Sequence, residues 1–247
     1  MSHSAPASGP SQHTVLGTVL TMPVQIRTAE QHMAMFSVDA DAAQRMIDYS
    51  GLRVYRHRPH RAIVVLMLMR YIDGDLGPYM EYGTNVMVNR PGSDSSGLRG
   101  LGSAGALVHH LPVDGEFTLQ AGRQIWGYPK VLADFTVHEG EPFGFEVSVD
   151  GQMAVGMDFK PGLPVPSAFT AKPQVQSTFS YLDGVLRETE GQMRLSGVRY
   201  RPGGVRIRLG DHPYAAELAA LGLPKRALLS SSVRNVQMTF ADAKEIS

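Results

Sequence analysis

The sequence predicts a single α+β domain built largely from antiparallel strands, and three observations support this fold class. From residue 116 onward, short strand-like stretches alternate with frequent Gly and Pro breaks, a spacing typical of antiparallel β-structure. Residues 62–69 form an eight-residue apolar run bounded by turn residues, too short for a typical helix, which predicts a buried strand. Two short stretches, 40–48 and 214–221, carry helix start and stop signals.

The N-terminal part is expected to contain a tail and one helix. Residues 1–13 are rich in Ser, Ala, Pro, Gly and His, which predicts a disordered tail followed by a folded domain over residues 14–247. Asp39 is expected to cap the helix over 40–48, because its side chain can accept a hydrogen bond from the first turn. Gly51 is expected to end this region.

The middle of the chain is expected to consist of strands. After the run at 62–69, a connection rich in Gly and Ser (91–102) leads to another strand at 104–109. Later strands are expected at 116–120, 132–138, 143–149, 153–159, 175–181, 192–200 and 203–209. Asp150-Gly151 predicts a hairpin turn, and the alternating pattern on either side predicts one buried face.

The C-terminal part is expected to contain one helix and the last strand. Gly222 and Pro224 follow the helix over 214–221 and are typical residues for ending it. Residues 233–240 predict the final strand.

Composition and charge exclude several classes of function. The chain has 247 residues, of which 43% are apolar, enough to bury one full core. Lys+Arg and Asp+Glu number 23 each, so no net field attracts nucleic acid or an anionic membrane, and a small-molecule partner is favoured. The absence of cysteine excludes disulfides, thiolate nucleophiles and cysteine metal sites. Because the apolar runs are short and the first twelve residues lack the apolar segment of a secretory signal, we expect a cytoplasmic protein without a membrane partner.

The segment Gly-Arg-Gln-Ile-Trp-Gly-Tyr-Pro-Lys at 122–130 places one lysine directly after a rigid, apolar turn. Lysines make up only five of the 23 cationic residues, so Lys130 needs a specific explanation. Its apolar neighbours withhold water and disfavour the ammonium, and a neutral lysine amine is a nucleophile. Taken alone, the motif is more often an ordinary turn followed by a solvated lysine.

This motif resembles that of the acetoacetate decarboxylase superfamily, whose members carry a Schiff-base lysine in a segment Gly-Arg-Glu-x-x-Gly-(Phe/Tyr)-Pro-Lys. Two further blocks agree in order and spacing: Gly-Pro-Tyr-Met-Glu at 77–81, and Leu-Ser-Ser-Ser at 229–232 with Phe-Ala-Asp-Ala at 240–243. The resemblance covers nearly the whole folded chain. It implies a curved, largely antiparallel sheet that closes into a cone- or barrel-like core with a few outer helices.

The resemblance also implies a reaction. The resemblance assigns imine formation to Lys130. It also places Glu81 beside the lysine, for proton transfer or substrate orientation. Without the resemblance, Glu81 would be interpreted as a solvated glutamate at the end of a strand. A protonated imine is an electron sink, so a lyase that decarboxylates a small keto acid is the leading expectation. No metal or organic cofactor is needed, and the family often forms oligomers, so we expect a homo-oligomer. The alternatives are a Schiff-base aldolase or dehydratase acting on a 2-oxo acid such as pyruvate, and a non-catalytic small-ligand binding protein.

Several positions depart from the family pattern. Val131 replaces a second lysine, Gln124 replaces a glutamate, and Leu66 stands where a second family glutamate falls if spacing is kept. Arg27 matches the family's substrate-facing arginine only approximately. Because these changes remove charge from the expected pocket, they favour the aldolase, dehydratase or cyclase members over acetoacetate as substrate. The residues expected to contact substrate are Arg27, Leu66, Tyr82, Gln124 and Trp126.

Two groups of histidines suggest metal or phosphate binding at first sight, His109-His110 and the segment 57–61. Adjacent residues on a strand point to opposite faces, and no carboxylate lies at ligand spacing, so the sequence predicts no metal site. By the same alternation, one of His109 and His110 is expected to face the pocket.

Overall fold

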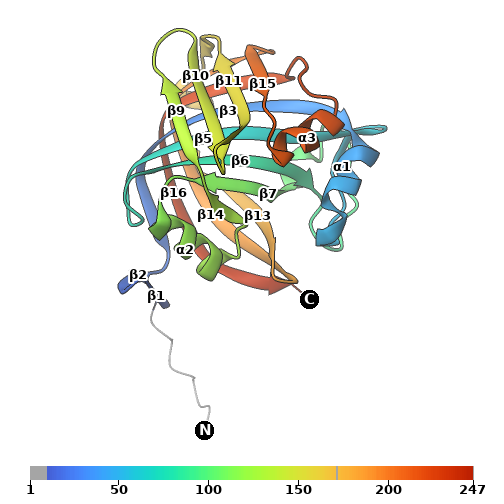
Figure 1. Ribbon diagram of the computed structural model, residues 1–247. Helices are drawn as coiled ribbons and strands as arrows, with labels where there is room; N and C mark the ends of the chain where they lie inside the picture. The colour runs from blue at the N-terminus through green and yellow to red at the C-terminus, as the bar shows by residue number, and fades with distance from the viewer. Residues whose placement is uncertain (1–9, 171, 247) are drawn as a thin grey trace.

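The computed structural model describes residues 10–170 and 172–246, and its central feature is a barrel of seven strands (Figure 1). These strands are β3 (Val24–Asp39), β5 (Arg61–Gly74), β6 (Tyr79–Val88), β7 (Gly105–Val113), β13 (Gln174–Leu182), β14 (Val185–Arg201) and β16 (Leu229–Ile246). They pair in the order β14-β13-β7-β6-β5-β3-β16, and β16 pairs back to β14, which closes the ring. Neighbours are antiparallel except β13 and β7. The expected antiparallel, barrel-like fold is therefore confirmed.

Three short strands extend the barrel wall. They are β4 (Arg56–Arg58) beside β5, β12 (Leu163–Pro164) beside β14, and β8 (Lys130–Leu132) beside β7. β8 runs parallel to β7, which sets Lys130 opposite Leu111. The lysine is thus attached to the barrel wall through a backbone ladder rather than carried on a free loop.

A second, four-stranded sheet covers the outside of the wall. It contains β9 (Asp134–His138), β10 (Phe143–Val149), β11 (Gln152–Phe159) and β15 (Val205–Leu209), in the order β15-β11-β10-β9. Asp150 and Gly151 join β10 to β11 with φ of 50° and 74°, as the predicted hairpin turn requires. The inner side of this hairpin is buried, as expected.

Helices cover the remaining edges of the barrel. They are α1 (Ala40–Ile47), α2 (Glu116–Trp126) and α3 (Pro213–Ala220), with single 3-10 turns at Asp48–Ser50, Leu101–Ser103 and Ser167–Phe169. Asp39 caps α1 by accepting hydrogen bonds from two backbone N–H groups, and Gly51 adopts a φ of 71°, so the predicted start and stop are confirmed. α3 matches the second predicted helix. Within the described chain, no helix is both long and apolar enough to cross a membrane.

The barrel wall separates two cores. The outer core lies between the wall and the second sheet, and includes Phe36, Leu66, Tyr82 and Phe145. The inner core fills the barrel and packs against α2. Because successive residues of a strand face opposite sides of the wall, odd-numbered residues of β5 such as Met69 enter the inner core and even-numbered ones enter the outer core.

The structure corrects several expected elements. Residues 116–120 belong to helix α2, not to a strand, since their buried positions recur at helical spacing. The expected strand 132–138 is divided at Ala133 into β8 and β9, which join different sheets. The long strand β3 was not predicted from its residues.

The N-terminal boundary also differs from the expected one. Of the expected tail, residues 1–13, the first nine lie outside the described residues. Within the described part, Gln12 and His13 already belong to β1 (Gln12–Val15), which pairs with β2 (Thr18–Thr21). His13 also contacts Asp242 of β16 at 2.6 Å, which ties this hairpin to the barrel.

Candidate active site

A helix–turn–strand unit positions Lys130 on the inner face of the barrel. α2 ends at Gly127, whose φ of 62° reverses the chain, and Tyr128 donates its backbone N–H to the carbonyl of Gly122 at 3.0 Å. β8 then begins at Lys130. The rigid turn predicted from the Gly-Tyr-Pro-Lys segment is therefore a helix C-cap that delivers the lysine to the barrel.

The first glycine of the motif makes room for the lysine side chain. A Cβ atom at Gly122 would lie 2.5 Å from Cδ and 2.6 Å from Cε of Lys130, far closer than carbon atoms pack. The aliphatic part of Lys130 thus lies directly against the backbone of α2. This contact keeps the side chain extended toward the barrel interior.

The Lys130 ammonium group is buried and has three close neighbours. Nζ lies 2.9 Å from Oε2 of Glu81 on β6 and donates a hydrogen bond to Oγ1 of Thr118 on α2 at 2.8 Å. It also lies 5.1 Å from the ring centroid of Tyr79. The side chains of Lys130 and Glu81 are only 3% and 9% exposed. The ion pair is therefore shielded from bulk water.

Tyr71 fixes the second oxygen of the carboxylate. Its hydroxyl donates to Oε1 of Glu81 at 2.9 Å, and its ring stacks on Tyr79 at a centroid distance of 4.2 Å. Burial, and next the negative charge of Glu81, hold the pKa of Tyr71 well above its usual value. Tyr71 thus remains a hydrogen-bond donor at neutral pH, and it leaves Oε2 of Glu81 free for the lysine.

The ion pair faces a cavity of about 90 Å³ inside the barrel. All seven barrel strands contribute side chains to its wall, which places it in the interior. Half of the eighteen lining residues are methionines and aromatic residues: Met67, Met69, Tyr71, Tyr79, Trp126, Tyr128, Met193, Met238 and Phe240. The neutral polar ones are Gln31, Asn85, Gln176 and Thr178. Among the described lining residues, Lys130 is the single cation and Glu81 the single anion.

The structure brings together three of the residues expected at the site: Lys130, Glu81 and Trp126. Leu66 and Tyr82 do not reach the cavity. Both are fully buried in the outer core, because their positions on β5 and β6 have the parity that faces away from the interior. The expectation that they contact substrate is corrected, and on β5 the cavity is lined instead by Met67 and Met69.

Arg27 and Gln124 also lie outside the cavity. Arg27 is exposed on β3 and forms ion pairs with Asp73 at 2.8 Å and Asp75 at 2.7 Å, so its charge is neutralised at the surface. Gln124 lies on the exposed side of α2 and donates to Gln120 one turn earlier. These two expectations are likewise corrected.

Thr118 and Tyr71 were missed by the reasoning from sequence. Thr118 was assigned to a strand, although Thr118, Gly122 and Ile125 follow the i, i+4, i+7 spacing of a buried helix face. That spacing is the signal that could have identified it. Tyr71 closely follows the predicted strand 62–69, and only the pairing of β5 with β6 places it near Glu81.

Comparison with known proteins identifies the family of the chain. The family model for acetoacetate decarboxylase (ADC) matches residues 6–244. No curated protein sequence matches the chain. Among solved structures, acetoacetate decarboxylase from Legionella pneumophila subsp. pneumophila str. Philadelphia 1 is similar at 18% identity, with a TM-score of 0.68, over 99% of this chain and 93% of that one.

Two further solved structures have the same fold. An acetoacetate decarboxylase-like enzyme from Sphingomonas wittichii RW1 is 15% identical, with a TM-score of 0.66, over 98% of this chain and 100% of that one. The enduracididine biosynthesis enzyme MppR, in complex with the condensation product of pyruvate and imidazole 4-carboxaldehyde, is 18% identical, with a TM-score of 0.60, over 98% and 99%. Because the family model spans nearly all of the sequence, the chain belongs to the acetoacetate decarboxylase family.

Proposed function

We propose that this protein is a lyase that forms a Schiff base between Lys130 and a small keto acid and decarboxylates it. The observation that carries the proposal is the buried contact of 2.9 Å between Nζ of Lys130 and Oε2 of Glu81, beside an apolar cavity. A nucleophilic amine within hydrogen-bond reach of a proton acceptor is the arrangement that imine chemistry needs.

Glu81 supplies the proton transfers. Transfer of a proton from the Lys130 ammonium to Oε2 leaves a neutral amine, which attacks the substrate carbonyl carbon to give a carbinolamine. Return of that proton to the carbinolamine hydroxyl releases water and leaves a protonated imine. Tyr71 keeps the carboxylate oriented throughout, because it holds the other oxygen.

The apolar wall favours loss of the carboxylate. In a β-keto acid, the carbon that bears the carboxylate is bonded to the imine carbon. When the bond to the carboxylate breaks, its electron pair can therefore move toward the imine, which gives a neutral enamine and carbon dioxide. The described cavity offers a carboxylate only amide and hydroxyl donors besides Lys130, such as Gln31 and Asn85. A weakly stabilised carboxylate beside a cation favours a step that removes both charges. Protonation of the enamine carbon and hydrolysis then release a ketone and regenerate Lys130.

A 2-oxo acid is the second candidate substrate. The pyruvate complex of MppR, a protein of the same fold, supports it, as does the cavity volume of about 90 Å³, which suits a molecule of few heavy atoms. With a 2-oxo acid, Glu81 would remove a proton beside the imine carbon, and the resulting enamine would add to an aldehyde or eliminate water.

Borohydride trapping tests the proposal. The protein is reduced with sodium borohydride in the presence of acetoacetate, longer β-keto acids or pyruvate, and adducts are read by intact mass and peptide mapping. We expect a reduced adduct on the peptide that contains Lys130, with carbon dioxide release identifying the β-keto acid that is turned over. No adduct with any of these acids overturns both enzyme functions, and an adduct without carbon dioxide release favours the aldolase or dehydratase function over decarboxylation.

Two lysine variants make the trapping specific. Lys130→Met removes the amine with little change in side-chain length and should give no adduct. Lys160→Met removes an exposed lysine and should match the wild-type protein. Circular dichroism of both variants checks that the loss of adduct does not reflect unfolding.

A further inference from the structure

The outer face of the barrel carries a group of three potential metal ligands. His109 and His110 on β7 both contact the same carboxylate oxygen, Oε2 of Glu217 on α3, through Nε2 at 2.8 and 2.6 Å. One ligand atom from each residue can be chosen so that all three lie within 4.8 Å of one another, and among the described residues no other such group occurs. We refer to His109, His110 and Glu217 as the outer cluster.

A β-bulge explains how two consecutive histidines reach one carboxylate. On β6, Thr84 pairs with His110 and the next residue, Asn85, pairs with Val108, so His109 is an extra residue on β7. The bulge breaks the alternation of side chains at this point. The expectation that one histidine of the pair faces the pocket is therefore wrong. The sequence has no carboxylate at ligand spacing from the pair, and the fold supplies one from a distant helix, through Glu217.

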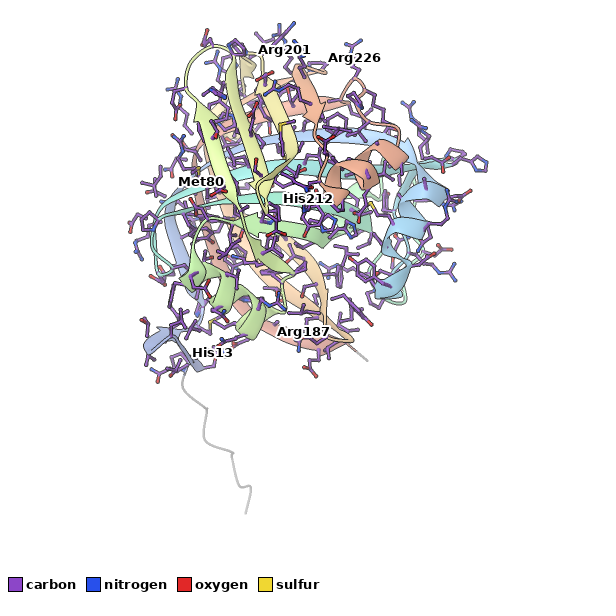
Figure 2. All side chains as sticks on the ribbon, viewed as in Figure 1. His13, Met80, Arg187, Arg201, His212 and Arg226 are labelled. Carbon is purple, nitrogen blue, oxygen red and sulfur yellow. The ribbon has the colours of Figure 1, made fainter. Side chains whose placement is uncertain are left out.

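Neighbouring side chains fix the orientation of both imidazoles. The hydroxyl of Tyr49 lies 2.9 Å from Nδ1 of His109, and the ring of Tyr214 stacks on His110 at a centroid distance of 3.5 Å. A metal-binding imidazole commonly uses one nitrogen for the ion and hydrogen-bonds through the other, so Tyr49 occupies the position of an outer-shell partner. His212, which caps α3 and is labelled in Figure 2, meets the ring of Tyr214 edge-on at a centroid distance of 4.4 Å.

Burial of the outer cluster suits a bound ion that can enter from solvent. The side chains of His109 and His110 are 7% and 14% exposed, whereas Glu217 is 40% exposed. Two imidazole nitrogens and one carboxylate oxygen are a donor set that zinc and similar divalent ions prefer. Water from the exposed side can complete a four-coordinate site.

We propose that His109, His110 and Glu217 bind a divalent transition-metal ion of the zinc class, which joins α3 to β7. The two histidine protons move from Nε2 to Nδ1 when the ion binds, and at His109 the new N–H donates to Tyr49. This site does not depend on the proposed lyase function. It lies on the other side of β7 from the cavity, whose wall β7 forms through Val108 and Leu111.

Metal titration of the full-length, chelator-treated protein tests the site. We expect one zinc ion per chain by isothermal titration calorimetry, and no comparable binding of Mg²⁺ or Ca²⁺. At zinc concentrations ~100-fold above the dissociation constant, the melting temperature should rise by about 5–10 °C. X-ray absorption of the zinc-loaded protein should give a first shell with two imidazoles.

Variants assign the binding to the outer cluster. Glu217→Gln and His110→Gln each remove one ligand and should weaken zinc binding by more than ~100-fold, whereas Tyr49→Phe should weaken it by about 10-fold through the outer shell. His138→Gln removes an exposed histidine elsewhere and should have no effect. Absence of zinc binding, binding unchanged in Glu217→Gln, or a first shell without two imidazoles would each overturn the proposal.

Discussion

On the inner face of the barrel wall, Lys130 and Glu81 are buried as a pair of opposite charges beside a cavity. On the outer face, the side chains of His109 and His110 are largely buried, and both contact the carboxylate of Glu217, a half-exposed residue of α3. The inner pair can exchange a proton and still face a small ligand, whereas the outer cluster holds two elements together. The same strand, β7, thus contributes to both sites, with Val108 and Leu111 in the cavity wall and His109 and His110 in the outer cluster.

The largest effect that separates the two faces is expected from Glu81→Gln. This change keeps the size of the side chain but removes the acceptor for the Lys130 proton, so turnover of the substrate identified by trapping should fall by about 10²–10⁴-fold. Steady-state kinetics with that substrate provide the measurement. Glu190→Gln, which alters an exposed glutamate, is the matched control.

Zinc binding in Glu81→Gln sharpens the comparison further. Because the outer cluster lies across β7, its zinc affinity should match that of the wild-type protein. If Glu81→Gln turns over substrate at the wild-type rate, Glu81 has no role in the reaction. If it loses zinc affinity together with turnover, the two faces are coupled.

The inner face was the more predictable of the two, because its lysine lies in a contiguous segment that ends at Lys130. Glu81 was predicted by its place in a second block, and α1 by its own cap at Asp39. The sequence could not decide which residues of β5 and β6 face the cavity, and so misplaced Leu66 and Tyr82. Both strands are apolar on both sides, because each side faces a core. The outer cluster could not be predicted, because Glu217 lies 107 or more positions after the histidines and the bulge at His109 has no signal in the sequence.

An intermediate effect is expected from Gly122→Ala. Alanine usually stabilises a helix interior relative to glycine, but here the added Cβ would meet Cδ of Lys130 at 2.5 Å and push the amine away from Glu81. A displacement of this kind costs about 10²-fold in turnover. Gly102→Ala, where a Cβ meets nothing within 4 Å, is the control and should leave turnover unchanged.

A double variant separates the clash from other effects of the methyl group. The same clash should lower the free energy of unfolding of Gly122→Ala, measured by urea unfolding. In the Lys130→Ala background the clashing atoms are gone, so adding Gly122→Ala should lower it no further. If Gly122→Ala is equally harmful with and without the lysine side chain, the glycine is not there to accommodate Lys130.

The smallest effect is expected from His32→Gln, on the outer face of β3, and it appears in the dependence of stability on pH. The ring of His32 stacks on Phe143 at 3.7 Å, and burial, then the positive charge of Arg70, lower the pKa of His32 from 6.5 to about 4. Between these two pH values the unfolded chain binds a proton that the folded protein does not. Stability is therefore lost as pH falls from about 6.5 through 4, at up to about 1.4 kcal/mol per pH unit from this residue.

In His32→Gln this contribution disappears, so the free energy of unfolding should fall less steeply with acid than in the wild-type protein. Urea unfolding at pH 7, 5.5 and 4 measures the difference, with His138→Gln as an exposed-histidine control that should follow the wild type. Identical slopes for all three proteins would mean that the outer core accepts a charged imidazole. The outer face would then be as tolerant of charge as the inner one, where a carboxylate offsets the buried cation.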